Sequence, residues 1–177
     1  MKRFLILLVS LSVLLSGCAL GLNNIKEPVT FYYPRPHDHQ EDYDDFFLNG
    51  TMGSELREAS GHRQDPKYLL SMYLQGPLSE DLTAPFPQGS KAVDILREVG
   101  SLTVTLNAAA SYLNDMELTV SCACLATTCM ELVDADTVTV QAIGIDKQIL
   151  FTRSFTESSL LLEDFETPSY TETEDTQ

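Results

Sequence analysis

The side chains of this sequence that could do chemistry are four cysteine thiols, three histidine imidazoles and several clusters of carboxylates. One thiol, Cys18, follows an apolar segment near the N-terminus, and the other three lie close together in the second half of the chain. A thiol can act as a nucleophile or a metal ligand, and imidazoles beside carboxylates can bind a divalent metal such as zinc. Besides Cys18, the candidate residues are Cys122, Cys124, Cys129, His37, Asp38 and His39.

Cys18 stands in a context that predicts attachment to lipid. Lys2 and Arg3 precede an apolar stretch that runs from Phe4 to Leu15. The stretch is too short to cross a bilayer permanently, but it has the length of the apolar region of a signal peptide. The sequence Leu15-Ser16-Gly17-Cys18 resembles the lipobox of bacterial lipoproteins. An ordinary signal peptide that happens to contain a cysteine is the alternative, but the basic residues, apolar run, small residues and cysteine all fall in register.

The lipobox resemblance implies that residues 1–17 are a signal peptide, that the Cys18 thiol takes a diacylglyceryl group, and that a peptidase cleaves just before it. The mature protein would then be held at the extracytoplasmic face of the cell membrane by fatty-acyl chains such as palmitate. Residues 18–28 are predicted to be the lipidated N-terminus and a spacer, which reaches about 30 Å from the lipid at full extension.

The charge of the chain excludes one class of partner. The formal net charge is −15, and removal of the signal peptide takes away two bases and no acid, which leaves −17. Such a chain is repelled by phosphate backbones, so we expect no binding to nucleic acid. Seven of the acids follow Arg153 without an intervening base, and residues 156–177 are predicted to be an acidic, disordered tail.

The segment that contains His37 and His39 is predicted to be a solvated polar loop over residues 34–50. It holds five acids as well as the two histidines, but the ordered spacing of a calcium-binding EF-hand loop is absent. We therefore assign no metal site and no cofactor. The same side chains leave an alternative function open, in which the protein is a ligand- or metal-ion-binding envelope lipoprotein.

The three later cysteines fall on a predicted helix over residues 114–132. Cys122 and Cys129 belong to its apolar stripe and lie about 10 Å apart along the axis, too far for a disulfide. Cys124 falls on another side, where we expect partial exposure, and the acids near it in sequence would raise the pKa of its thiol. We assign no catalytic residue, and because phosphate-loop, hydrolase and zinc-protease motifs are also absent from the sequence, we do not expect an enzyme.

Hydrophobic periodicity predicts an α+β fold of element order ββαββαββ, with two helices packed on one face of a mixed β-sheet. Asp65 and Pro66 give the first helix an N-cap and a proline at its first position, and Gly76-Pro77 ends it. Alternating apolar residues mark most of the strands. The expected strands span residues 29–33, 55–59, 91–99, 102–106, 137–142 and 149–155, and the expected helices span 67–75 and 114–132.

Three stretches of the sequence resemble a single GerM domain, a family known from sporulation and spore germination proteins. They are the helix that ends in Leu74-Gln75-Gly76-Pro77, the loop over residues 85–90, and the late helix with the strand of residues 136–144. The resemblance covers residues 29–155, which we take as a GerM-like domain. It departs from the family after Leu106, where an Asp and a Ser are often found and this chain has Asn107-Ala108-Ala109.

The resemblance to GerM domains implies a fold similar to the ring-building domains of secretion and sporulation channel complexes. It also implies a non-enzymatic, lipid-anchored assembly or scaffold module outside the cytoplasmic membrane, in sporulation or spore germination. The implied partners are envelope or sporulation-complex proteins, the membrane through the lipid anchor, and a second copy of the chain in a homo-oligomer.

Overall fold

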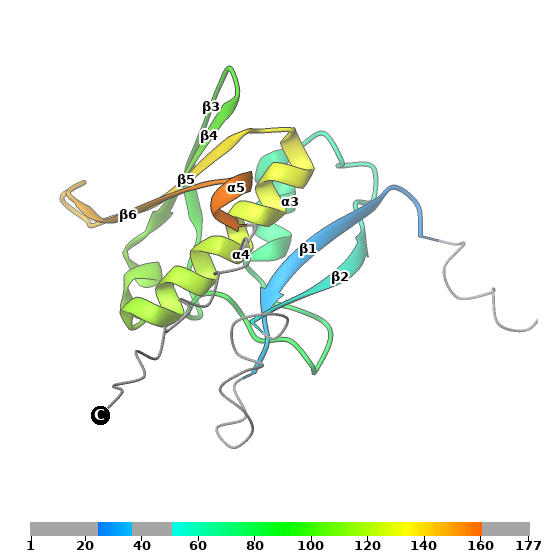
Figure 1. Cartoon of the computed structure of the whole chain (residues 1–177), viewed down its shortest axis with the longest axis horizontal. Helices are drawn as coiled ribbons and strands as arrows, with labels where there is room; N and C mark the ends of the chain where they lie inside the picture. The colour runs from blue at the N-terminus through cyan, green and yellow to red at the C-terminus, as the bar shows by residue number, and fades with distance from the viewer. Residues whose placement is uncertain (1–24, 37–50, 161–177) are drawn as a thin grey trace, which may run out of the picture.

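The computed structural model describes residues 25–36 and 51–160, and these form an α+β fold, as predicted (Figure 1). The strands and the two longer helices follow the predicted order, and two short helices, η1 and α5, are additions that the sequence did not predict. In chain order the elements are β1 (Pro28–Pro34), β2 (Met52–Glu58), α3 (Pro66–Tyr73), β3 (Ala92–Glu98), β4 (Ser101–Asn107), η1 (Ala108–Tyr112), α4 (Asp115–Val133), β5 (Thr137–Ile143), β6 (Ile149–Thr156) and α5 (Glu157–Leu160).

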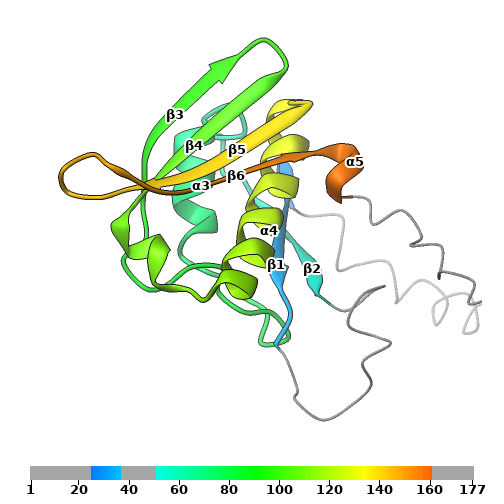
Figure 2. The same ribbon diagram turned by 60° about the vertical axis from the view of Figure 1, so that its left-hand side comes forward.

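The described strands form two sheets, so the prediction of a single sheet was wrong. β1 and β2 pair antiparallel as a separate two-stranded sheet, called here the β1–β2 ribbon. The other sheet has the order β3-β4-β5-β6 and is mixed, because β4 and β5 run parallel while the outer pairs are antiparallel. The helices α3 and α4 lie between this sheet and the ribbon, which gives three layers (Figure 2).

The ribbon is a separate sheet because β1 packs on a helix rather than beside another strand of the core. Val29, Phe31 and Tyr33 alternate along β1 and are almost fully buried. Between them, the backbone N–H of Tyr32 donates to the hydroxyl oxygen of Thr128 on α4 at 2.9 Å. The strand thus buries its apolar face in the layered core, and one of its backbone donors is satisfied by a side chain of α4.

Both longer helices begin at a side-chain cap, and the cap of α3 is the predicted Asp65. The Asp65 side chain accepts a hydrogen bond from the backbone N–H of Tyr68 at 3.1 Å. Asn114 and Glu117 form a capping box, in which each side chain accepts from the backbone N–H of the other. These bonds satisfy N–H groups that have no partner within the first turn of a helix.

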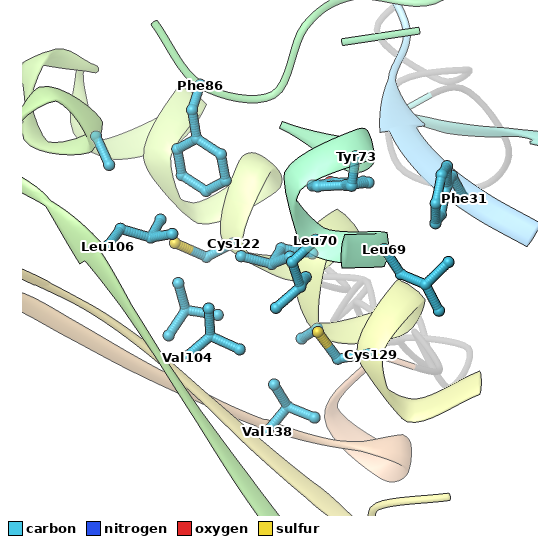
Figure 3. Packing of buried hydrophobic residues seen from close by; sticks show 14 of the residues in the cluster. Phe31, Leu69, Leu70, Tyr73, Phe86, Val104, Leu106, Cys122, Cys129 and Val138 are labelled. Atoms are coloured by element: carbon cyan, nitrogen blue, oxygen red, sulfur yellow. The ribbon is translucent and has the colours of Figure 1, made fainter. Parts of the chain in front are cut away.

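The helix α4 is the centre of the hydrophobic core. Its Cys122 and Cys129 lie among side chains of the four-stranded sheet, such as Val104 and Val138 (Figure 3). By length and composition alone α4 could cross a membrane, but here it contacts both sheets and much of its surface is buried. The buried residues that it joins come from β1, α3, β4 and β5 and include Phe31, Tyr33, Leu69, Leu70, Tyr73, Leu102, Leu106, Val140 and Ala142.

Candidate functional site

Two of the groups singled out in the sequence lie outside the described residues. Cys18 belongs to residues 1–24, and the segment with His37 and His39 belongs largely to residues 37–50. Lipidation of Cys18 therefore stays a prediction. Within residues 25–36 and 51–160, no group of three or more His, Cys, Asp or Glu side chains could hold a metal ion.

The three cysteines of α4 are all buried, and none of them forms a disulfide in the described part of the chain. The predicted partial exposure of Cys124 is wrong: its side chain is 0% exposed, because β1 packs on the side of α4 that lacks the apolar stripe. Burial, rather than neighbouring acids, raises the pKa of all three thiols to about 12. They are protonated at neutral pH, so they supply no nucleophile.

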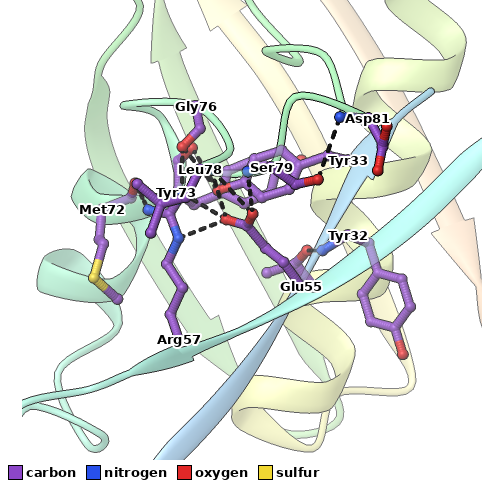
Figure 4. A network of polar contacts seen from close by, with 11 residues as sticks. Tyr32, Tyr33, Glu55, Arg57, Met72, Tyr73, Gly76, Leu78, Ser79 and Asp81 are labelled. Carbon is purple, nitrogen blue, oxygen red and sulfur yellow. Dashed lines mark hydrogen bonds and ion pairs between the residues drawn. The ribbon is translucent and has the colours of Figure 1, made fainter. Parts of the chain in front are cut away.

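A buried polar cluster joins β2 to the turn after α3 (Figure 4). The Arg57 guanidinium donates to the carbonyl oxygens of Gly76 at 2.5 Å and Met72 at 3.4 Å, and its Nε donates to Glu55 at 2.6 Å. The same group lies over the ring of Phe31, 5.6 Å from the ring centre. A cation at the C-terminal end of α3 stabilises carbonyl groups that have no partner within the helix.

Glu55 completes this cluster from the same strand. Its carboxylate accepts hydrogen bonds from the backbone N–H groups of Leu78 at 3.0 Å and Ser79 at 3.1 Å. The turn between these residues and α3 contains Gly76 at φ +93°, a conformation that glycine adopts without strain. Because the carboxylate and the guanidinium are engaged with each other and with the backbone, the cluster holds the turn in place and offers no free catalytic group.

Sequence reasoning missed this cluster, although a signal for it was present. Glu55 and Arg57 are two residues apart, so on a strand they lie on the same face. A charged face of a strand normally indicates solvent, so the sequence of β2 does not indicate that these side chains are buried. The Leu-x-Gly-Pro turn could have pointed to a buried cation, because several carbonyl groups end there without helical partners.

The four-stranded sheet has one face that the described elements leave open (Figure 2). The side chains on this face alternate with the buried ones and bond across strands: Gln141 donates to the Thr105 hydroxyl at 2.9 Å, and the hydroxyls of Thr139 and Ser154 lie 2.9 Å apart. On β4, β5 and β6 a partner could cover this face without removing charges from water, whereas β3 adds Asp94 and Glu98, which pair with Thr105 and Ser101. On β4, β5 and β6 the residues of this face include Thr103, Thr105, Thr137, Thr139, Gln141, Thr152, Ser154 and Thr156.

The strand β3 is one of the two edges of this sheet, and it exposes apolar side chains. Val93 is 50% exposed and Leu96 is 53% exposed, and Val99 is fully exposed in the turn that follows. An edge strand also presents backbone N–H and C=O groups that can pair with a strand of another chain. Charges at Asp94 and Arg97 and a bulge at Asp94 oppose indiscriminate pairing, so the edge suits a selected partner.

Comparison with known proteins finds no matching family model and no matching curated protein. Solved structures with a similar fold include the following two. One is a protein from Clostridium perfringens described as a candidate lipoprotein, with 12% identity over 74% of this chain and 87% of that chain and a TM-score of 0.44.

The other similar structure holds the tandem GerMN domains of the sporulation protein GerM from Bacillus subtilis. It is 15% identical over 73% of this chain, with a TM-score of 0.45, and the match spans 45% of that longer chain. Both similarities concern the overall arrangement of elements, and neither assigns a role to a residue of this chain.

Proposed function

We propose that the protein is a non-enzymatic assembly module, anchored by lipid at Cys18 to the extracytoplasmic face of the cell membrane, which binds other envelope proteins through strand β3. The observation that carries this proposal is the row of exposed apolar side chains on an open sheet edge, Val93 and Leu96, with Val99 at its end. Apolar side chains beside free backbone groups suit addition of a partner strand.

The setting that we propose is sporulation or spore germination. It is supported by the sequence resemblance of residues 29–155 to GerM domains. One stretch that carries this resemblance, Leu74–Pro77, contains Gly76, whose carbonyl oxygen accepts from Arg57. A non-enzymatic role is supported by the state of the reactive side chains in the described residues. The thiols are buried and protonated, and the buried carboxylate of Glu55 is fully bonded.

The proposal is tested by crosslinking and affinity capture of the tagged full-length lipoprotein from membranes of its own host. Cys18→Ala removes the predicted anchor. Leu96→Lys places a charge on the open edge, and Leu78→Lys is its matched control, because Leu78 is also highly exposed but lies outside the four-stranded sheet. We expect capture of envelope or sporulation-complex proteins that is reduced by Cys18→Ala and Leu96→Lys but kept in Leu78→Lys.

Two results would count against the proposal in different ways. If no protein is captured with the wild-type chain during growth or sporulation, the assembly function is wrong. If partners are captured equally well by Leu96→Lys and Leu78→Lys, the function stands but strand β3 is not the contact.

A further inference from the structure

A groove of about 440 Å³ runs along the C-terminal half of α4, and its residues Asp134 and Ala135 also border the turn between β3 and β4. Met130 and Glu131 of α4 line its floor, and the β1–β2 ribbon and α5 provide the other walls. Three of the lining side chains, Met52, Met130 and Leu160, are half-buried and come from three different elements. The interior of the groove is therefore largely apolar and is built by the tertiary fold rather than by one segment.

Four carboxylates surround this apolar interior. Glu131, Asp134, Asp136 and Glu157 all line the groove and are exposed, and its lining contains no Lys, Arg or His. The pKa of the Tyr32 phenol is raised by partial burial and by its hydrogen bond with Glu131. The phenol therefore stays protonated and holds one of the carboxylates at the groove.

Two of these acids are unfavourable for α4, because Glu131 lies in its last turn and Asp134 is its C-cap. The C-terminus of a helix bears a partial negative charge, so acids there are destabilising and bases are favoured. The last turn of α4 has no basic residue, and Arg97 reaches its end only from β3, by donating to the Val133 carbonyl at 2.8 Å. A negative rim that weakens its own helix gives a reason to look for a positively charged occupant.

We propose that this groove binds an amphipathic segment of a partner protein, with one apolar side chain between Met52, Met130 and Leu160 and adjacent Lys or Arg side chains at the acidic rim. The continuation of this chain after Leu160 fits less well, because it carries six acids and no base. Anionic lipid headgroups would be repelled by the same carboxylates. Charge complementarity of this kind contributes to the association rate and to the choice of partner.

The test uses the full-length lipoprotein in nanodiscs of zwitterionic phosphatidylcholine and a fluorescent peptide of about twelve residues, roughly three helical turns, with leucine and lysine on opposite faces. Binding is measured by fluorescence anisotropy, with empty nanodiscs as the background. One matched peptide replaces leucine by serine, and another replaces lysine by glutamate. The first peptide should bind, and both replacements should weaken binding.

The protein variants separate the groove from the net charge. Glu131→Gln with Asp134→Asn neutralises two rim acids, and asparagine tolerates the left-handed conformation of residue 134 (φ 52°). Glu80→Gln with Asp81→Asn removes the same charge from an exposed loop outside the groove. We expect the rim variant to weaken binding by at least about tenfold and the loop variant to leave it within about twofold.

Equal weakening by the two variants would overturn the proposal, because net charge would then explain the binding. So would equal binding of the leucine and serine peptides, or no binding above the empty-nanodisc background. None of these results touches capture of partners through Leu96, so the groove can fail while the proposed function stands.

Discussion

Replacing Arg57 with methionine tests the buried cluster that links β2 to the end of α3. The change keeps an apolar stem but removes the donor to Gly76 and Met72, and it leaves the Glu55 carboxylate, 12% exposed, without its counter-charge. Removing one partner of a buried ion pair costs about 3–5 kcal/mol. Because each kcal/mol shifts the Tm of a domain of this size by roughly 3–4 °C, we expect the Tm to fall by roughly 10–20 °C.

The assay is thermal unfolding for the Tm and urea unfolding for the free energy, both followed by circular dichroism, on the wild type, Arg57→Met, Glu55→Gln and the double variant. The double variant should lose less stability than the sum of the two single losses, since its second change removes the unpaired charge. Arg153→Met is the matched control, because it breaks an exposed pair with Asp115 of the same 2.6 Å length and should cost less than about 1 kcal/mol. If Arg57→Met loses no more stability than this control, the cluster does not hold the fold as argued.

Three further predictions concern the core and the alternative function. Tyr73→Phe should raise the free energy of unfolding by about 1 kcal/mol in urea titration, because the Tyr73 hydroxyl is the buried side-chain polar atom without a hydrogen-bond partner in the described residues; a clear loss would indicate a partner such as ordered water. Folding raises the pKa values of the three thiols from 9 to about 12. The free energy of unfolding should therefore hold its full value below pH 9 and fall between about pH 9 and 12, because only the unfolded chain loses these protons there. Unfolding curves at pH 8 and 11 that coincide would contradict this. Zinc or calcium at about 1 mM should leave the Tm unchanged, whereas a rise would favour the ligand-binding alternative, since a ligand of the folded state raises the Tm.

Much of the secondary structure could be predicted because its signals are local. Asp65 caps α3 and Asn114 caps α4, each through a bond to a residue three positions away. The alternation of residues 137–142 likewise located β5. Caps, turns and alternation depend on a few neighbouring residues, so they are visible without knowledge of what packs against them.

The contacts between elements could not be predicted in the same way. The second buried side of α4 consists of Ser121, Cys124 and Thr128, which are small and only weakly apolar. Such residues do not form a hydrophobic stripe, yet their size allows β1 to approach the helix closely. The prediction of one sheet and of an exposed Cys124 failed for this single reason.

The hydrogen bond from Tyr32 to Thr128 joins residues 96 positions apart, and this separation has a consequence for the order of folding. β1 is made early, but the helix surface that completes its environment is made much later, after β2, α3, β3 and β4. Long-range contacts of this kind delay folding, because the chain must close a large loop before they stabilise anything. Until α4 is in place, Phe31 and Tyr33 can pack on Tyr73 of α3 alone, so a chain with α4 still unformed leaves much of the apolar face of β1 uncovered and open to aggregation.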